Sequence, residues 1–170
     1  MAETEKARPE PIEAPESLKA VLEGAAQGEV DPRLRISLVV AGGAPSQRYH
    51  FNFAASGSGE VSAELSCDLS NRRGKAEGRK LDEAQVAELV RTILAGGLLD
   101  APAELPGFLP DTVVGILELS DGTSSVRWNF AADPEQARSQ QAEPPPAVVE
   151  AADAIYTLAG KLMEQRSVKP

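Results

Sequence analysis

The chain has 170 residues, of which 42% are hydrophobic and 25% are charged, a composition typical of one globular domain. Its net charge of −9 argues against general binding to nucleic acids or to anionic membranes. The single cysteine excludes an internal disulfide, and no run approaches the roughly 18 apolar residues that a membrane span needs. The N-terminus is acidic and apolar-poor, unlike a secretory signal, so we expect a cytoplasmic protein with no membrane partner.

Residues 1–31 form an acidic segment rich in Pro, Glu and Ala, with eight acidic and three basic side chains. Such a segment buries little apolar surface, which predicts a disordered tail. Within it, Ser17 can cap a short helix, Ser17–Glu23, that presents Leu18, Val21 and Leu22 on one side. This helix either forms transiently in the tail or docks on the domain or on a partner.

Three segments of alternating polarity follow, and each predicts a strand: residues 34–41, 48–55 and 61–69. In the third, Cys67 falls on the same side as Leu65 and Leu69, which predicts a buried thiol that behaves as a small apolar group. His50 alternates to the side opposite its apolar neighbours, where we expect a solvated side chain.

Residues 71–80, NRRGKAEGRK, are the most basic stretch of the chain, with a net charge of +4, and we expect a long basic loop. Its cations either bind phosphate groups or an acidic partner, or they only keep a long connection soluble. No aromatic residue interleaves them, which weakens a nucleic-acid role. The candidate partner-binding residues are Arg72, Arg73, Lys75, Arg79 and Lys80.

A helix is predicted directly after this stretch. Asp82 and Gln85 fit a capping box, and Gly96 or Gly97 fits a left-handed C-terminal cap. The spacing of the apolar residues places one stripe against the core: Val86, Leu89, Val90, Ile93 and Leu94. Residues 101–110 contain three prolines and predict a loop, in which Phe108 covers the edge of the core.

The clearest fold signal is residues 113–132, VVGILELSDGTSSVRWNFAA. Asp121-Gly122 between two alternating runs predicts a hairpin with a two-residue type I′ turn. This turn would set Gly115 opposite Trp128, so that the glycine leaves room for the indole ring. Residues 133–146 predict a flexible excursion, and residues 147–163 predict a closing helix with a buried stripe: Val148, Ala152, Ile155, Ala159 and Leu162.

The predicted order of elements is β-β-β-α-β-β-α within one domain, residues 32–170. Short antiparallel strands with two amphipathic helices favour an α+β fold, with a mostly antiparallel sheet of about five strands and both helices on one face.

The residues give little sign of catalysis. One histidine and one cysteine disfavour a metal site, and no motif marks a nucleophile for His50 to activate. The glycine-rich turns match neither phosphate-binding pattern, and the carboxylates form no recognisable acid–base pair. We therefore expect no catalytic residue, no metal and no cofactor.

The run from the Asp82 helix through AGGLLDAPAE, then DTVVGILELSDGTSSVRWNFAADP, then the closing helix, resembles the emfourins. These are small α+β inhibitors of thermolysin-like metallopeptidases. The likeness covers the order of elements over residues 34–162, and its sharper part is a helix ending in Gly-Leu-Leu-Asp before an Asp-Gly hairpin. No inhibitory motif matches residue by residue, so the resemblance assigns no binding residues.

The resemblance implies a proteinaceous inhibitor, and the residues favour a non-enzymatic domain that binds another protein. The alternative is a module that binds phosphate or nucleic acid through residues 72–80. A small hydrolase is the third reading.

Overall fold

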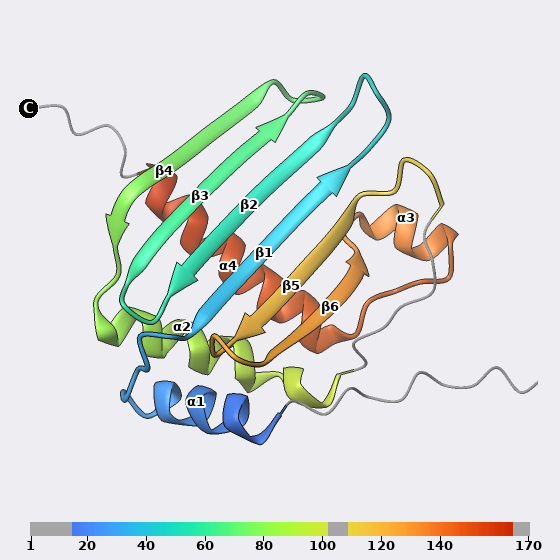
Figure 1. Cartoon of the computed structure of the whole chain (residues 1–170). Coiled ribbons are helices and arrows are strands. Elements are labelled where there is room, and N and C mark those ends of the chain that lie inside the picture. The colour runs from blue at the N-terminus through green and yellow to red at the C-terminus, as the bar shows by residue number, and fades with distance from the viewer. Residues whose placement is uncertain (1–14, 102–108, 165–170) are drawn as a thin grey trace, which may run out of the picture.

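The structure is a computed structural model that describes residues 15–101 and 109–164 (Figure 1). It has an α+β fold, as the sequence predicts, built on one six-stranded antiparallel sheet in the order β4-β3-β2-β1-β5-β6. The strands are β1 (Arg35–Gly42), β2 (Tyr49–Ser56), β3 (Glu60–Cys67), β4 (Arg72–Lys80), β5 (Val114–Ser120) and β6 (Ser125–Ala131). The helices are α1 (Glu16–Ala26), α2 (Glu83–Ala95), the 3-10 turn η1 (Leu98–Asp100), α3 (Pro134–Ser139) and α4 (Pro146–Glu164).

Helices α2 and α4 cover one face of the sheet (Figure 1). The alternation of the strands directs Leu38, Phe53 and Leu117 into this layer, and all three are fully buried. The other face carries exposed polar side chains such as Asn52 and Asn129. Within the described ranges, no helix is long and apolar enough to cross a membrane.

The prediction for α2 is confirmed in detail. The Asp82 carboxylate accepts a hydrogen bond from the Gln85 backbone N–H, and the Gln85 side chain accepts one from the Asp82 N–H, which completes the capping box. After the helix, Gly97 adopts a left-handed conformation with a φ of 81°. The buried face of α2 packs on α4 and on α1.

The prediction of disorder is wrong for residues 15–31, because α1 docks on the domain. Leu18, Leu22 and Ala25 are buried, and the helix packs on α2. Pro15, not Ser17, stands at the N-cap. The segment is acidic overall, but α1 has one short apolar face, and this face is buried only when the chain folds. Residues 1–14 of the predicted tail lie outside the described residues.

The predicted basic loop is in fact an edge strand, β4, so the sheet has six strands in the described chain and not five. Pairing with β3 forms the strand, and a bulge interrupts the register between Val61 and Ala63. Charged residues, glycines and bulges are typical of exposed edges, because they prevent further strand pairing. Such a strand lacks the apolar alternation by which strands are recognised in a sequence.

The β5–β6 hairpin forms, but its register differs from the prediction by two residues. The turn is Gly122-Thr123, since the Asp121 N–H donates to the Ser124 carbonyl at 3.1 Å and Ser120 pairs with Ser125. Gly122 has a φ of +89°, whereas Asp121 is not among the residues with positive φ. A glycine alone at the first central position fits a type II′ turn, which explains the shift.

The shifted register changes the partner of Gly115. It faces Phe130, and a Cβ on Gly115 would lie 2.2 Å from the Phe130 Cζ atom. The glycine therefore accommodates a phenyl ring and not the indole. Trp128 faces Leu117, is 1% exposed, and donates its Nε1–H to the Ala101 carbonyl at 3.2 Å.

Part of the predicted flexible excursion is helical. Asp133 caps α3 by accepting hydrogen bonds from the Glu135 and Gln136 backbone N–H groups, and Ala137 and Ala142 are buried. The excursion prediction therefore fails where a cap and two buried alanines anchor the chain. The closing helix is confirmed as α4, with its predicted stripe buried. Phe108 lies outside the described residues.

Candidate functional site

The two ends of the sheet are built differently. At one end lie the β2–β3 and β5–β6 turns, beside α1, and we call it the closed end (Figure 1). At the other lie the β1–β2 and β3–β4 turns, residues 109–113 and α3, and we call it the open end.

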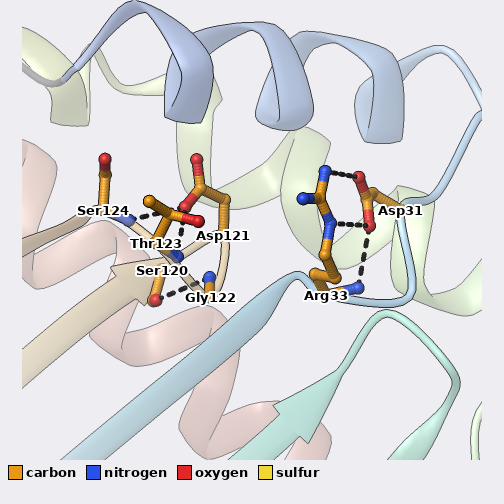
Figure 2. Close-up of polar contacts among 7 residues, drawn as sticks. All are labelled: Asp31, Arg33, Ser120, Asp121, Gly122, Thr123 and Ser124. Atoms are coloured by element: carbon orange, nitrogen blue, oxygen red, sulfur yellow. Dashed lines mark hydrogen bonds and ion pairs between the residues drawn. The ribbon is translucent and has the colours of Figure 1, made fainter.

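At the closed end, polar groups satisfy one another (Figure 2). The buried Asp121 carboxylate accepts from the Ser124 and Thr123 backbone N–H groups at 2.7 and 2.8 Å. These bonds, with smaller contributions from the Ser17 hydroxyl and the charge of Arg33, hold the pKa of Asp121 below its ordinary value, although burial opposes them. The Asp121 carboxylate therefore makes its hydrogen bonds within the turn, which it stabilises.

Asp31 and Arg33 complete the closed end. The Arg33 guanidinium donates to the Asp31 carboxylate at 2.9 and 3.2 Å, and this hydrogen bonding lowers the pKa of Asp31 (Figure 2). The pair is exposed and therefore contributes little to stability. It fixes the chain between α1 and β1 and offers no reactive group.

At the open end, two adjoining hollows lie between the sheet, α3 and α4. Their volumes are about 450 and 350 Å³, and Ala132, Pro134 and Tyr156 line both. We call the two hollows together the trough. Leu69 lines the first hollow, and Val149 lines the second.

Exposed apolar side chains line the trough or lie near its lining in the chain. Among the described residues, the large hydrophobic side chains that are exposed are Leu69 (72%), Leu109 (64%) and Val149 (38%). The prediction that the strand extends to residue 69 is wrong, because β3 ends at Cys67 and Leu69 lies in the turn that follows. The turn closes through the hydrogen bond from the Asn71 N–H to the Asp68 carbonyl, with Asn71 at a φ of 50°.

Two glutamines of α3 and its C-terminal end hold the segment that carries Leu109. The Gln140 side chain accepts from the Leu109 N–H at 3.2 Å and donates to the Thr112 hydroxyl at 2.8 Å. The Gln136 side chain accepts from the Val113 N–H at 2.8 Å and donates to the Asp111 carbonyl at 3.2 Å. Leu109 is therefore displayed at the start of a segment, residues 109–113, that hydrogen bonds hold to α3 and its C-terminal end.

The wall of the first hollow contains two tyrosines and the cysteine. The hydroxyls of Tyr156 and Tyr49 share a hydrogen bond, and burial raises the pKa of both phenols. Cys67 is half-buried, not fully buried as predicted, and hydrogen bonds from Ser70 lower the pKa of its thiol. Cys67 thus forms part of the trough surface.

The pleat of β4 divides the five predicted partner-binding cations between two faces. Arg72 and Arg79 stand opposite Cys67 and Val61, on the helix side of the sheet. The other three stand opposite Ser66, Glu64 and Glu60, on the face of the sheet that the helices do not cover: Arg73, Lys75 and Lys80. Two of them pair with carboxylates, Arg73 with Asp68 at 3.6 Å and Lys75 with Glu77 at 3.0 Å.

His50 is exposed on the face opposite the core, as the alternation predicts. It pairs in register with Ser66, whereas Cys67 pairs with Tyr49, so His50 and Cys67 point to opposite faces. The part of the chain that the structure describes contains no group of three or more His, Cys, Asp or Glu side chains placed to hold a metal ion.

Sequence reasoning missed the trough and its exposed leucines. One signal was present: Asp68, Ser70 and Asn71 are turn-forming residues around Leu69, which favours an earlier end of the strand. Comparison with models of known protein families gives no match, and comparison with curated proteins gives no significant similarity.

Proposed function

We propose that this protein is a non-enzymatic domain that binds another protein through its open end. The observation that carries the proposal is that the exposed Leu69 and Val149 line one trough, with the exposed Leu109 two residues before Asp111 of the same lining. Contiguous exposed apolar surface with a polar rim is typical of interaction sites, because its exposure to water is otherwise unfavourable.

The arrangement of reactive side chains supports a non-enzymatic role. The chain's one histidine and one cysteine lie on opposite faces of β2 and β3, so they form no nucleophile–base pair. Asp121, the buried carboxylate, is occupied by backbone donors. A hydrolase therefore receives no support from these groups.

Inhibition of a metallopeptidase is the most concrete form of the proposal. It is supported by the order of elements that resembles the emfourins, namely the α2 helix with its Gly-Leu-Leu-Asp end, the β5–β6 hairpin and α4. A fixed segment that displays Leu109 also suits an inhibitor, because a preorganised loop loses little conformational entropy on binding.

The test is a titration of a thermolysin-type metallopeptidase with the full chain. We expect inhibition that weakens at least tenfold in the double variant Leu69→Asp/Leu109→Asp. The matched control adds the same charge at the closed end, Thr123→Asp/Gln27→Asp, and should inhibit like the wild type. Absence of inhibition would remove the inhibitor form of the proposal.

The wider proposal is tested by capture of partners from the native host followed by mass spectrometry. A partner retained by the wild type and by the closed-end control, but lost with Leu69→Asp/Leu109→Asp, is the expected result. A partner retained equally by all three proteins would contradict binding through the open end.

The alternative, nucleic-acid binding through residues 72–80, is disfavoured by the division of these cations between two faces of an edge strand. It is tested with random DNA and RNA oligonucleotides at about 0.15 M salt, where weak phosphate contacts are screened. Submicromolar binding, abolished when Arg72, Arg73, Lys75, Arg79 and Lys80 are changed together to Ser, would favour the alternative.

A further inference from the structure

We propose that the trough binds a short segment of the partner that is both apolar and basic. This inference rests on the proposed function, and it adds the chemistry of the partner. It is carried by the apolar lining of the trough, by the carboxylates on its rim and by the uneven distribution of charge between the two layers of the domain.

The lining of the trough selects apolar side chains. Phe130, Ala152 and Val149 line the second hollow, and Val40, Val113 and Leu69 line the first. Both volumes, about 450 and 350 Å³, fall within the range of ligand-binding clefts. Because Ala132, Pro134 and Tyr156 line both hollows, one continuous segment can occupy them together.

The charged side chains of the lining select a basic segment. Asp111 and Asp133 line the first hollow, and Glu143 and Asp153 line the second. Arg138 is the one basic side chain among the residues of the two linings. Asp133 caps α3 through two backbone N–H groups, and within the described chain none of the four carboxylates is in an ion pair, so no cation of the domain neutralises their charges.

The charge of the whole helical layer acts in the same direction. Its segments, residues 15–31, 81–101 and 133–164, carry 14 acidic and four basic side chains. The strands and their turns, residues 32–80 and 109–132, carry nine basic and seven acidic side chains. The trough opens beside α3 and α4, so a basic segment is attracted there and an acidic one is repelled.

The experiment is selection from a displayed library of random 16-residue peptides with the full chain as bait. We expect the enriched peptides to be apolar with an excess of Lys and Arg. Their binding, measured at about 0.15 M salt with synthetic copies, should weaken at least tenfold in Glu143→Lys/Asp153→Lys. The control Glu23→Lys/Glu83→Lys, which makes the same charge change on α1 and α2, should change binding less than threefold.

Amide chemical shifts place the peptide. We expect the largest shifts upon binding at Ala132, Tyr156 and Val149. Enrichment of acidic peptides, no enrichment, or equal loss in both charge-reversal variants would overturn the inference. If a captured protein partner binds Glu143→Lys/Asp153→Lys as tightly as the wild type, the protein-binding function stands and this inference fails.

Discussion

The closed and open ends of the sheet both carry leucines and carboxylates, but these side chains lie in different surroundings. At the closed end, Leu18 and Leu22 of α1 are buried, and the Asp121 carboxylate accepts backbone hydrogen bonds. At the open end, Leu69 and Leu109 are exposed, and three carboxylates of the trough lining have no ion-pair partner in the described chain: Asp111, Glu143 and Asp153. The closed end therefore buries these side chains within the domain, whereas the open end presents apolar side chains that binding can bury.

The largest expected effect is at the closed end. Leu22 is 1% exposed, so Leu22→Ala should lower the free energy of unfolding by about 2–5 kcal/mol, because it leaves a cavity under α1. Urea denaturation measures the change. The exposed neighbour Glu23 is the control, and Glu23→Ala should stay within about 0.5 kcal/mol of the wild type. Equal stability of the two variants would mean that α1 does not form part of the folding unit.

A second change tests the register that joins the hairpin to the core. Gly115→Ala places a Cβ against the Phe130 ring and should cost about 1–3 kcal/mol through overpacking. Phe130→Leu in the same chain should recover part of this loss, whereas Trp128→Phe should not. Rescue by the change at Trp128 instead would support the register that the sequence predicts.

A third change tests how Asp121 shapes the closed end. Because its folded pKa is lowered, its ionised form adds stability at pH values above its ordinary pKa of 3.8, and this stability is lost as the pH falls through the folded pKa. Asp121→Asn keeps an acceptor oxygen but does not titrate. Its melting temperature should be below that of the wild type near pH 6, and the two should converge as the pH falls below 3.8 and through the folded pKa. A difference that is constant with pH would contradict the assignment.

The smallest effect on stability is expected at the open end. Leu69→Ser and Val149→Ser remove exposed side chains and should each change the free energy of unfolding by about 0.5 kcal/mol or less. Both should nevertheless weaken binding of the partner or of a selected peptide. A large loss of stability in either variant would show that the side chain supports the fold, which would remove the contrast between the two ends.

The candidate site was harder to predict than the fold. Leu69 was placed inward because the alternation of residues 61–67 continues past the end of the strand. The trough arises where the β3–β4 turn, α3 and α4 meet, and these segments are far apart in the sequence. Leu109 gains its fixed position from Gln140, which lies 31 residues away. No local pattern in the sequence predicts contacts between segments so far apart.

The sequence by itself determined the elements whose signals are local. The alternation of Ile36, Leu38 and Val40 directs β1 onto the core, and the Asp82–Gln85 capping box begins α2. Both signals act within one turn or a few residues, so the chain carries them before it folds. The α+β class follows from the order of such elements.

The tertiary structure decided the features that depend on a partner segment. β4 is a strand because it pairs with β3. The helix α1 is ordered because it packs on α2 and buries Leu18 and Leu22. The turn at Gly122-Thr123 follows from the positive φ of Gly122, and the register that it sets places Phe130 against Gly115. For β4 and α1 the physical reason is the same: the deciding free energy comes from contacts with another segment of the folded chain, which neither segment supplies alone.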